Sequence, residues 1–159
     1  MRVSKQISRS VTVLGAGIQG CCTALELSSR GYEVTLLERD ALAMNRASLR
    51  NEGKIHLGLV YANEASMETA RLQLEGALSF RHLLEKWVGN SANMLGNSTT
   101  FDYLVAVDSL LSSAELEDHY MALQLHYLER LREEPGLDYL GSQPAQLYRK
   151  ISENKLQSR

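Results

Sequence analysis

The chain has 159 residues, of which 44% are apolar and 23% charged, a composition typical of ordinary globular proteins. Seventeen basic and 19 acidic residues give a formal net charge of −2, which argues against a strongly basic nucleic-acid-binding surface. No apolar stretch approaches the ~20 residues that span a membrane, and no signal-peptide pattern is present. We therefore expect a cytoplasmic protein with no membrane span and no nucleic-acid partner.

The first forty residues predict a β-strand, a glycine turn, a helix and a second β-strand. This order is that of a βαβ unit with a Gly-x-Gly-x-x-Gly turn, and an acidic residue, Glu38, follows the second strand. The parts are, in order, Val11–Leu14, Gly15-Ala-Gly17-Ile-Gln-Gly20, a helical stretch to Arg30, Gly31 as its C-terminal cap, and Glu33–Leu37.

Each glycine has a physical role in such a turn. Gly15 permits the tight turn out of the strand, Gly17 allows the backbone to approach a pyrophosphate, and Gly20 lets the helix pack close to the strand. The N–H groups at the start of the helix, with its positive dipole end, would face the phosphates. Glu38, 18 residues after Gly20, would accept hydrogen bonds from an adenosine ribose, and its charge disfavours a 2′-phosphorylated nucleotide.

The glycines alone leave open whether the nucleotide is FAD or NAD, because both contain adenosine diphosphate. A simple nicotinamide dehydrogenase continues into another helix and parallel strand, whereas residues 39–47 show little periodicity. The following segment contains Gly53 and Gly58, which suggest bulges or a close approach of the backbone to a ligand.

The sequence resembles the FAD-dependent oxidoreductases of the D-amino-acid-oxidase superfamily in two consecutive segments. These are Gly15–Glu38 and the pattern Ser48-x-x-Asn51-x-Gly53-x-Ile55. The run Asn51–Tyr61 looks most like its L-2-hydroxyglutarate dehydrogenase branch. The resemblance implies an α/β fold, with a Rossmann-like FAD-binding βαβ unit and part of an α+β substrate region. It implies FAD as cofactor and oxidation of a small-molecule 2-hydroxy acid or amino acid by hydride transfer to flavin. The implied cofactor-binding residues are Gly15, Gly17, Ile18, Gln19, Gly20, Glu38, Arg39, Ser48, Asn51, Gly53 and Ile55.

The resemblance makes His56 the candidate catalytic residue, near the flavin and the substrate. It could help to bind or deprotonate an acidic substrate, because imidazole titrates near neutral pH. It could equally be a buried, hydrogen-bonded histidine that positions the loop. We expect no metal site: Cys21 and Cys22 are adjacent, without metal-ligand spacing, and His119 and His126 would lie ~10.5 Å apart along one helix.

The second half predicts mostly helical scaffold. We expect a helix over 66–88, a strand over Phe101–Val107, and a helix to about Glu134 that starts at a capping box of Ser112 and Glu115. The predicted domains are residues 1–62, the N-terminal part of the FAD-binding domain, and 63–159, a partial substrate and FAD-binding region.

The strands that complete a doubly wound sheet are missing from this sequence. We therefore expect the chain to be the N-terminal portion of a longer flavoprotein, with no catalysis of its own. The alternatives are a non-catalytic FAD- or NAD-binding fragment, or an NAD-dependent dehydrogenase.

Overall fold

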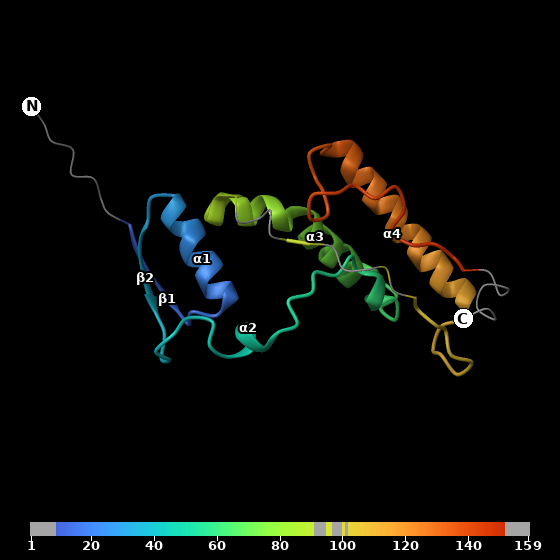
Figure 1. Ribbon diagram of the computed structural model, residues 1–159, viewed down its shortest axis with the longest axis horizontal. Coiled ribbons are helices and arrows are strands. Elements are labelled where there is room, and N and C mark those ends of the chain that lie inside the picture. Colours follow the sequence, from blue (N-terminus) through green and yellow to red (C-terminus); the bar gives the residue numbers. More distant parts are fainter. Residues whose placement is uncertain (1–8, 91–94, 97–99, 101, 152–159) are drawn as a thin grey trace, which may run out of the picture. The chain divides into compact units, whose positions relative to one another are not determined.

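The computed structural model describes residues 9–90, 95–96, 100 and 102–151, and it consists of two compact units (Figure 1). Unit 1 comprises residues 1–54 and unit 2 residues 55–159. The predicted division at residues 62 and 63 concerns the domains of a longer protein and stays a prediction.

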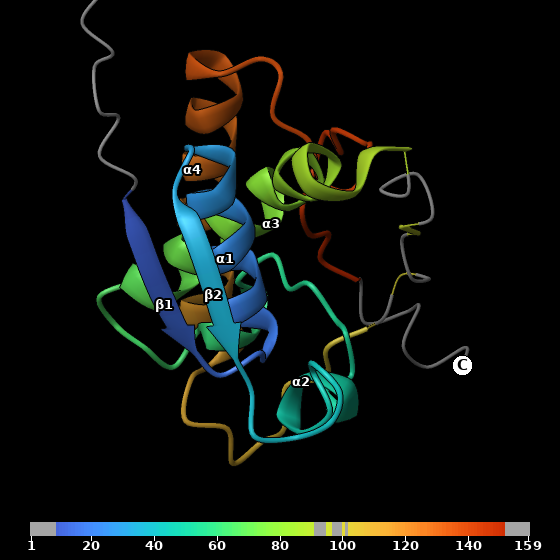
Figure 2. The same cartoon turned by 90° about the vertical axis from the view of Figure 1, so that its left-hand side faces the viewer.

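Unit 1 is a parallel βαβ unit, as predicted. The two strands pair in register from Ser10 opposite Glu33 to Leu14 opposite Leu37, and the helix between them covers one face of the pair (Figure 2). A parallel pair needs such a crossover, because a tight turn can join only antiparallel strands. The elements of unit 1 are β1 (Ser10–Leu14), α1 (Ile18–Ser29), β2 (Glu33–Leu37) and α2 (Ala47–Arg50).

The end of α1 confirms the predicted glycine cap. Gly31 has a φ of +81°, which suits glycine, and its N–H donates to the carbonyl of Ser28 at 3.0 Å. The N–H of Tyr32 donates to the carbonyl of Leu27 at 3.1 Å. This pair of bonds is the Schellman motif, which ends the helix and turns the chain into β2.

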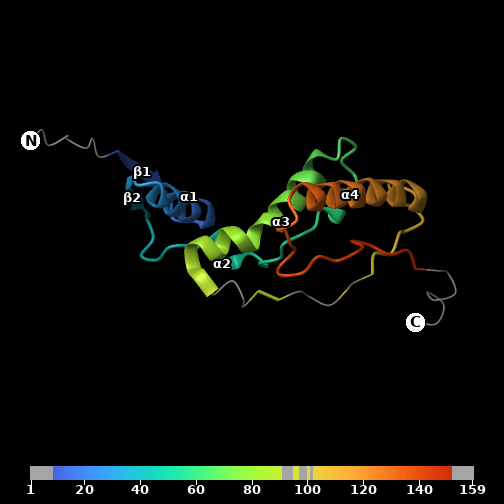
Figure 3. The same cartoon turned by 90° about the horizontal axis from the view of Figure 1, so that it is seen from above.

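Unit 2 is built on two 21-residue helices that pack together (Figure 3). They are α3 (Glu68–Val88) and α4 (Ser113–Glu133), and the short 3₁₀ helix η1 (Leu59–Tyr61) precedes them. Apolar residues recur at helical spacing on both long helices, so each has a stripe that is stabilised by burial against the other. The buried core cluster consists of Ala70, Leu74, Leu78, Leu123, Tyr127 and Leu137.

The capping box predicted for α4 is present. The Ser112 hydroxyl accepts from the N–H of Glu115 at 3.3 Å, and the Glu115 carboxylate accepts from the N–H of Ser112 at 2.8 Å. The N–H of Ser112 also holds the pKa of Glu115 below its ordinary value. Two backbone donors that have no partner within the helix are thus satisfied.

The predicted strand over 101–107 is wrong for the residues that the structure describes. Phe101 lies outside them, and 102–107 form no strand. Leu104 and Val107 are largely exposed. A strand needs the N–H and C=O groups of a neighbour, and the only ladder within the described ranges joins β1 to β2. The β-rich composition of this segment was therefore not sufficient to make it a strand.

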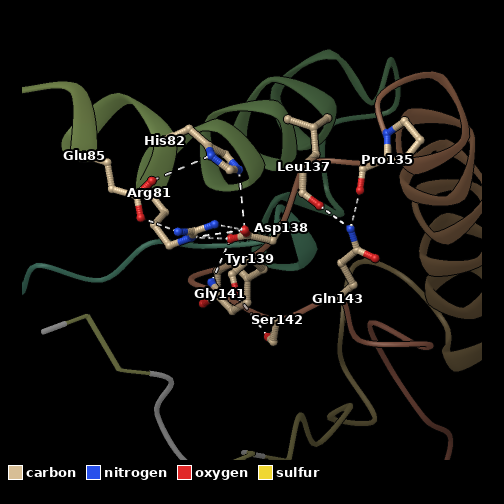
Figure 4. A network of polar contacts seen from close by, with 10 residues as sticks. All are labelled: Arg81, His82, Glu85, Pro135, Leu137, Asp138, Tyr139, Gly141, Ser142 and Gln143. Carbon is tan, nitrogen blue, oxygen red and sulfur yellow. Dashed lines mark hydrogen bonds and ion pairs between the residues drawn. The ribbon is translucent and has the colours of Figure 1, made fainter. Parts of the chain in front are cut away.

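A polar network ties α3 to the segment after α4 (Figure 4). The Arg81 guanidinium donates to the buried Asp138 carboxylate, with Nε 2.9 Å from Oδ1, and Nη2 contacts Oδ2. Asp138 Oδ1 also accepts from the N–H of Gly141 at 2.7 Å, and Arg81 contacts Glu85 as well. These donors, Arg81 first, hold the pKa of Asp138 below its usual range.

No helix in the described part of the chain is long and apolar enough to cross a membrane.

Candidate functional site

The turn between β1 and α1 is so tight that it needs glycine at positions 15 and 20. Gly15 has a φ of +94°, a conformation that residues with side chains rarely adopt, and its N–H donates to the carbonyl of Leu37 at 2.7 Å. A Cβ on Gly20 would lie 1.9 Å from the carbonyl oxygen of Gly15. Glycine at position 20 is therefore needed for the first turn of α1 to pass this close to the end of β1.

The N-terminus of α1 presents backbone donors beside an open glycine. The first intrahelical bond runs from the N–H of Cys21 to the carbonyl of Gly17 at 2.9 Å, so the N–H groups of Gln19 and Gly20 have no partner within the helix. The N–H of Ile18 donates to the Ser48 hydroxyl at 2.9 Å. A Cβ on Gly17 would meet only the Ser48 hydroxyl, at 3.6 Å, so the space in front of Gly17 is open.

The Glu38 carboxylate lies against the glycine turn. Its Oε2 accepts from the N–H of Ala16 at 2.7 Å, and its Oε1 accepts from the N–H groups of Arg39 and Asp40 at 2.8 and 3.1 Å. These bonds, the one from Ala16 first, lower the pKa of Glu38, so the side chain is a carboxylate at neutral pH. Since a carboxylate accepts at about four lone-pair sites, it can accept one further donor.

Sequence reasoning missed two residues that organise this site, Asp40 and Arg46. Arg46 donates to Asp40 through Nε and Nη2, at 2.7 and 2.8 Å, and the N–H of Met44 donates to the carbonyl of Ala16 at 2.7 Å. No periodicity or motif marks these residues, which lie in the irregular segment before α2. An open pocket of about 430 Å³ adjoins the pair and is lined by Asp40, Asn45, Arg46, Ala47 and Arg50.

The remaining predicted residues lie in the segment that follows α2. The Asn51 side chain accepts from the N–H of Gly53 at 2.8 Å, and Gly53 has a φ of +66°. Ile55 and His56 belong to unit 2, where the Ile55 carbonyl accepts from the Tyr139 hydroxyl at 2.9 Å and His56 is half-buried. No group of His, Cys, Asp and Glu side chains that could hold a metal ion occurs among the described residues.

The structure thus brings together, within unit 1, the three glycines, Glu38 and Ser48. Free N–H groups at a helix N-terminus, a cradle that a Cβ at position 17 would narrow, and a neighbouring carboxylate fit the diphosphate and ribose of a dinucleotide. They do not by themselves distinguish FAD from NAD.

Comparison with known families resolves this choice. The DAO family model, described as FAD dependent oxidoreductase, matches residues 10–142. The chain belongs to the DAO family of FAD-dependent oxidoreductases. FAD is therefore the cofactor that the family implies, and the βαβ unit is the Rossmann-like start of a DAO domain. The match extends through α4, so both units carry the DAO signal.

Curated relatives match a shorter part of the chain. The tRNA 5-methylaminomethyl-2-thiouridine biosynthesis bifunctional protein MnmC is 40% identical over 78 residues in both Pseudomonas savastanoi pv. phaseolicola and Pseudomonas syringae pv. syringae. MnmC of Pseudomonas fluorescens is 43% identical over 51 residues.

The first two matches cover 49% of this chain and 11% of the relative, and the third covers 32% and 8%. The chain thus spans a small part of the length of these curated relatives. No solved structure matches the chain.

Proposed function

We propose that unit 1 binds the adenosine diphosphate half of FAD at the turn between β1 and α1. The observation that carries the proposal is the open space at Gly17, beside the N–H groups at the start of α1. An anion placed there would accept hydrogen bonds from the backbone and interact favourably with the positive end of the helix dipole. The membership in the DAO family supports FAD as the dinucleotide.

In this proposal Glu38 accepts a hydrogen bond from a ribose hydroxyl, with the lone-pair capacity that its three backbone donors leave. The Ser48 hydroxyl and the N–H groups of Gln19 and Gly20 face the pyrophosphate. Four further residues stay predicted cofactor contacts, because only the family resemblance supports them. They are Arg39, Asn51, Gly53 and Ile55.

We propose further that the longer protein oxidises a C–H bond next to an amine or a hydroxyl group, with bound FAD as the hydride acceptor. The MnmC names contain a methylaminomethyl group, which favours an amine, whereas the run Asn51–Tyr61 favoured a 2-hydroxy acid such as L-2-hydroxyglutarate. None of the three relatives reported above is an L-2-hydroxyglutarate dehydrogenase. We therefore place an amine first and keep His56 as the candidate group that orients or deprotonates the substrate.

A matched pair of glycine variants tests FAD binding. The fold should tolerate Gly17→Ala, because the φ of −70° is allowed for alanine and its Cβ would meet only the Ser48 hydroxyl, at an ordinary contact distance. The added methyl group would, however, keep a phosphate away from the backbone. We expect it to weaken FAD binding by about tenfold or more, which corresponds to ~1.4 kcal/mol. Gly76→Ala, inside α3 with open space around it, is the control and should bind FAD like the wild type.

The measurement is a titration of the purified chain with FAD, followed by flavin fluorescence and by the absorption spectrum after gel filtration. A folded wild-type chain that takes up no FAD would overturn the proposal, and uptake of NAD in its place would support the NAD-binding alternative. Equal affinity of the Gly17→Ala and wild-type chains would exclude the glycine turn as the site. We expect no turnover of hydroxy acids or amines by this chain alone.

A further inference from the structure

The loop that joins β2 to α2, residues 38–46, is held in place without a hydrophobic core. Its large apolar side chains, Leu42 and Met44, are both exposed. Within this loop only Asp40 is partly buried, with 16% of its side chain exposed. Its conformation must therefore be maintained by polar contacts.

Two such contacts close the loop. The Arg46 guanidinium forms a bidentate pair with Asp40, through Nε to Oδ2 at 2.7 Å and Nη2 to Oδ1 at 2.8 Å. The N–H of Met44 donates to the carbonyl of Ala16 in the glycine turn. Met44 has a φ of +59°, in the left-handed region that is unfavourable for residues with a side chain. The contacts of Asp40, Arg46 and Met44 compensate for this strain.

The loop matters for the site because one site residue lies on each side of the Asp40–Arg46 pair. Glu38 precedes the loop closure and contacts the N–H of Ala16, while Ser48 follows it and contacts the N–H of Ile18. Asp40 and Arg46 lie six positions apart within the segment from Glu38 to Ser48, so their pair restricts how far apart these two site residues can lie. A bidentate pair defines the relative orientation of its two side chains better than a single bond does.

We propose that Asp40 and Arg46 are positioning residues for FAD: their bidentate pair keeps the 38–46 loop closed, so that Glu38 and Ser48 stay against the glycine turn. The inference rests on the proposed function, binding of FAD by unit 1. It requires no contact between the pair and FAD. The pair instead increases the fraction of molecules in which the site is already formed, and the apparent affinity rises with that fraction.

A double-mutant cycle on the full chain tests the pair. We expect Arg46→Gln and Asp40→Asn each to weaken FAD binding on the order of tenfold, and the double variant to be no weaker than either single variant. The matched control is Arg30→Gln, which removes an exposed ion pair, at 2.8 Å, between the residue that follows α1 and Glu26 of α1 in the same unit. It should leave the affinity unchanged.

A second measurement separates positioning from general stability. In the FAD-free chain, the N–H of Ile18 should exchange with solvent faster in Arg46→Gln than in the wild type, because its acceptor Ser48 is less well held. The control Arg30→Gln should leave this exchange unchanged. Ser48→Ala should also weaken FAD binding less in the Arg46→Gln background than in the wild-type background.

The outcomes are distinct. If the wild type binds FAD and both single variants bind equally well, the inference is wrong and the proposed function stands. If the losses of the single variants multiply in the double variant, the two residues do not act as a pair and the inference is also wrong. If the folded wild type binds no FAD, the proposed function fails and the inference falls with it.

If Arg46→Gln does not fold, as judged by circular dichroism, Arg46→Lys replaces it. Lysine keeps the charge but cannot form the bidentate pair, so we expect it to weaken FAD binding about threefold.

Discussion

The two units of this chain reach a defined structure by different means. Within the described residues of unit 1, only Ala16 is buried, and the strand residues Leu14 and Leu37 are exposed by 80% and 51%. Unit 2 instead buries large side chains such as Leu74, Leu123 and Tyr127 completely. Unit 1 is held by a parallel ladder, glycine conformations and polar contacts, and unit 2 by apolar packing.

This difference shows where a ligand has the most effect. A fold with little apolar burial gains little from the hydrophobic effect, which is the main stabilising contribution in most domains. A molecule that binds only the folded form raises its stability by mass action. FAD should therefore stabilise unit 1, where the proposed site for its adenosine diphosphate half lies.

The largest effect is expected in the core of unit 2. Leu123→Ala removes a completely buried side chain from the α3–α4 interface and should lower the free energy of unfolding by about 2–5 kcal/mol. Leu125→Ala, two residues away on α4 and 56% exposed, is the control and should change it by less than about 0.5 kcal/mol. Denaturant unfolding followed by fluorescence of Trp87, the single tryptophan, reports unit 2. Equal effects of the two variants would contradict the packed core.

A smaller loss is expected from a steric change in unit 1. Gly20→Ala places a methyl group against the carbonyl of Gly15 and should cost roughly 1–3 kcal/mol. Gly17→Ala, in open space, is the control for stability and should leave unit 1 folded. Amide hydrogen exchange of peptides from residues 10–37 measures this loss, while the Trp87 unfolding transition of unit 2 should not move. Unchanged exchange in Gly20→Ala would show that α1 does not pass this close to β1.

The smallest effect concerns the polar network of unit 2 and depends on pH. Asp138→Asn removes the charge that faces Arg81 and should cost about 1–2 kcal/mol at neutral pH. Because the pKa of Asp138 is lowered in the folded state, its contribution is complete above the ordinary aspartate value of 3.8 and is lost as the pH falls through the lower folded value.

The difference in unfolding free energy between the wild type and Asp138→Asn, measured from pH 7 to pH 2.5, should therefore shrink below about pH 4. A difference that stays constant over this range would mean that the charge of Asp138 does not contribute to the free energy of unfolding. Lys150→Gln, which removes an exposed ion pair with Glu117 in the same unit, is the control and should have little effect at any pH.

The elements that could be predicted from the sequence depend on short-range signals. The glycine turn, the cap at Gly31 and the capping box of Ser112 and Glu115 all involve residues within a few positions of each other, and all are present. The strand over 101–107 depended on a distant partner, and for 102–107 it was wrong. Propensity describes how a residue fits a sheet and does not supply the sheet.

Long-range polar contacts were beyond prediction for the same reason. Arg81 interrupts the apolar stripe of α3, and its partner Asp138 lies 57 residues later. Glu75 on α3 likewise accepts from Arg130 on α4 at 2.9 Å, and contacts His126 at 3.0 Å. Helical periodicity indicates which face a residue occupies, but not which charge another element brings to that face.

By itself, the sequence determined the order strand, glycine turn, helix, strand and acid, and with it the dinucleotide-binding character and the resemblance to FAD-dependent oxidoreductases. Glycine conformations and helix caps are local, so residues close together in the sequence determine them. Only the tertiary structure decided that Glu38 and Ser48 contact the glycine turn and that Asp40 pairs with Arg46. An irregular loop has no period from which its closure could be predicted, and its contacts exist only once the chain has folded back on itself.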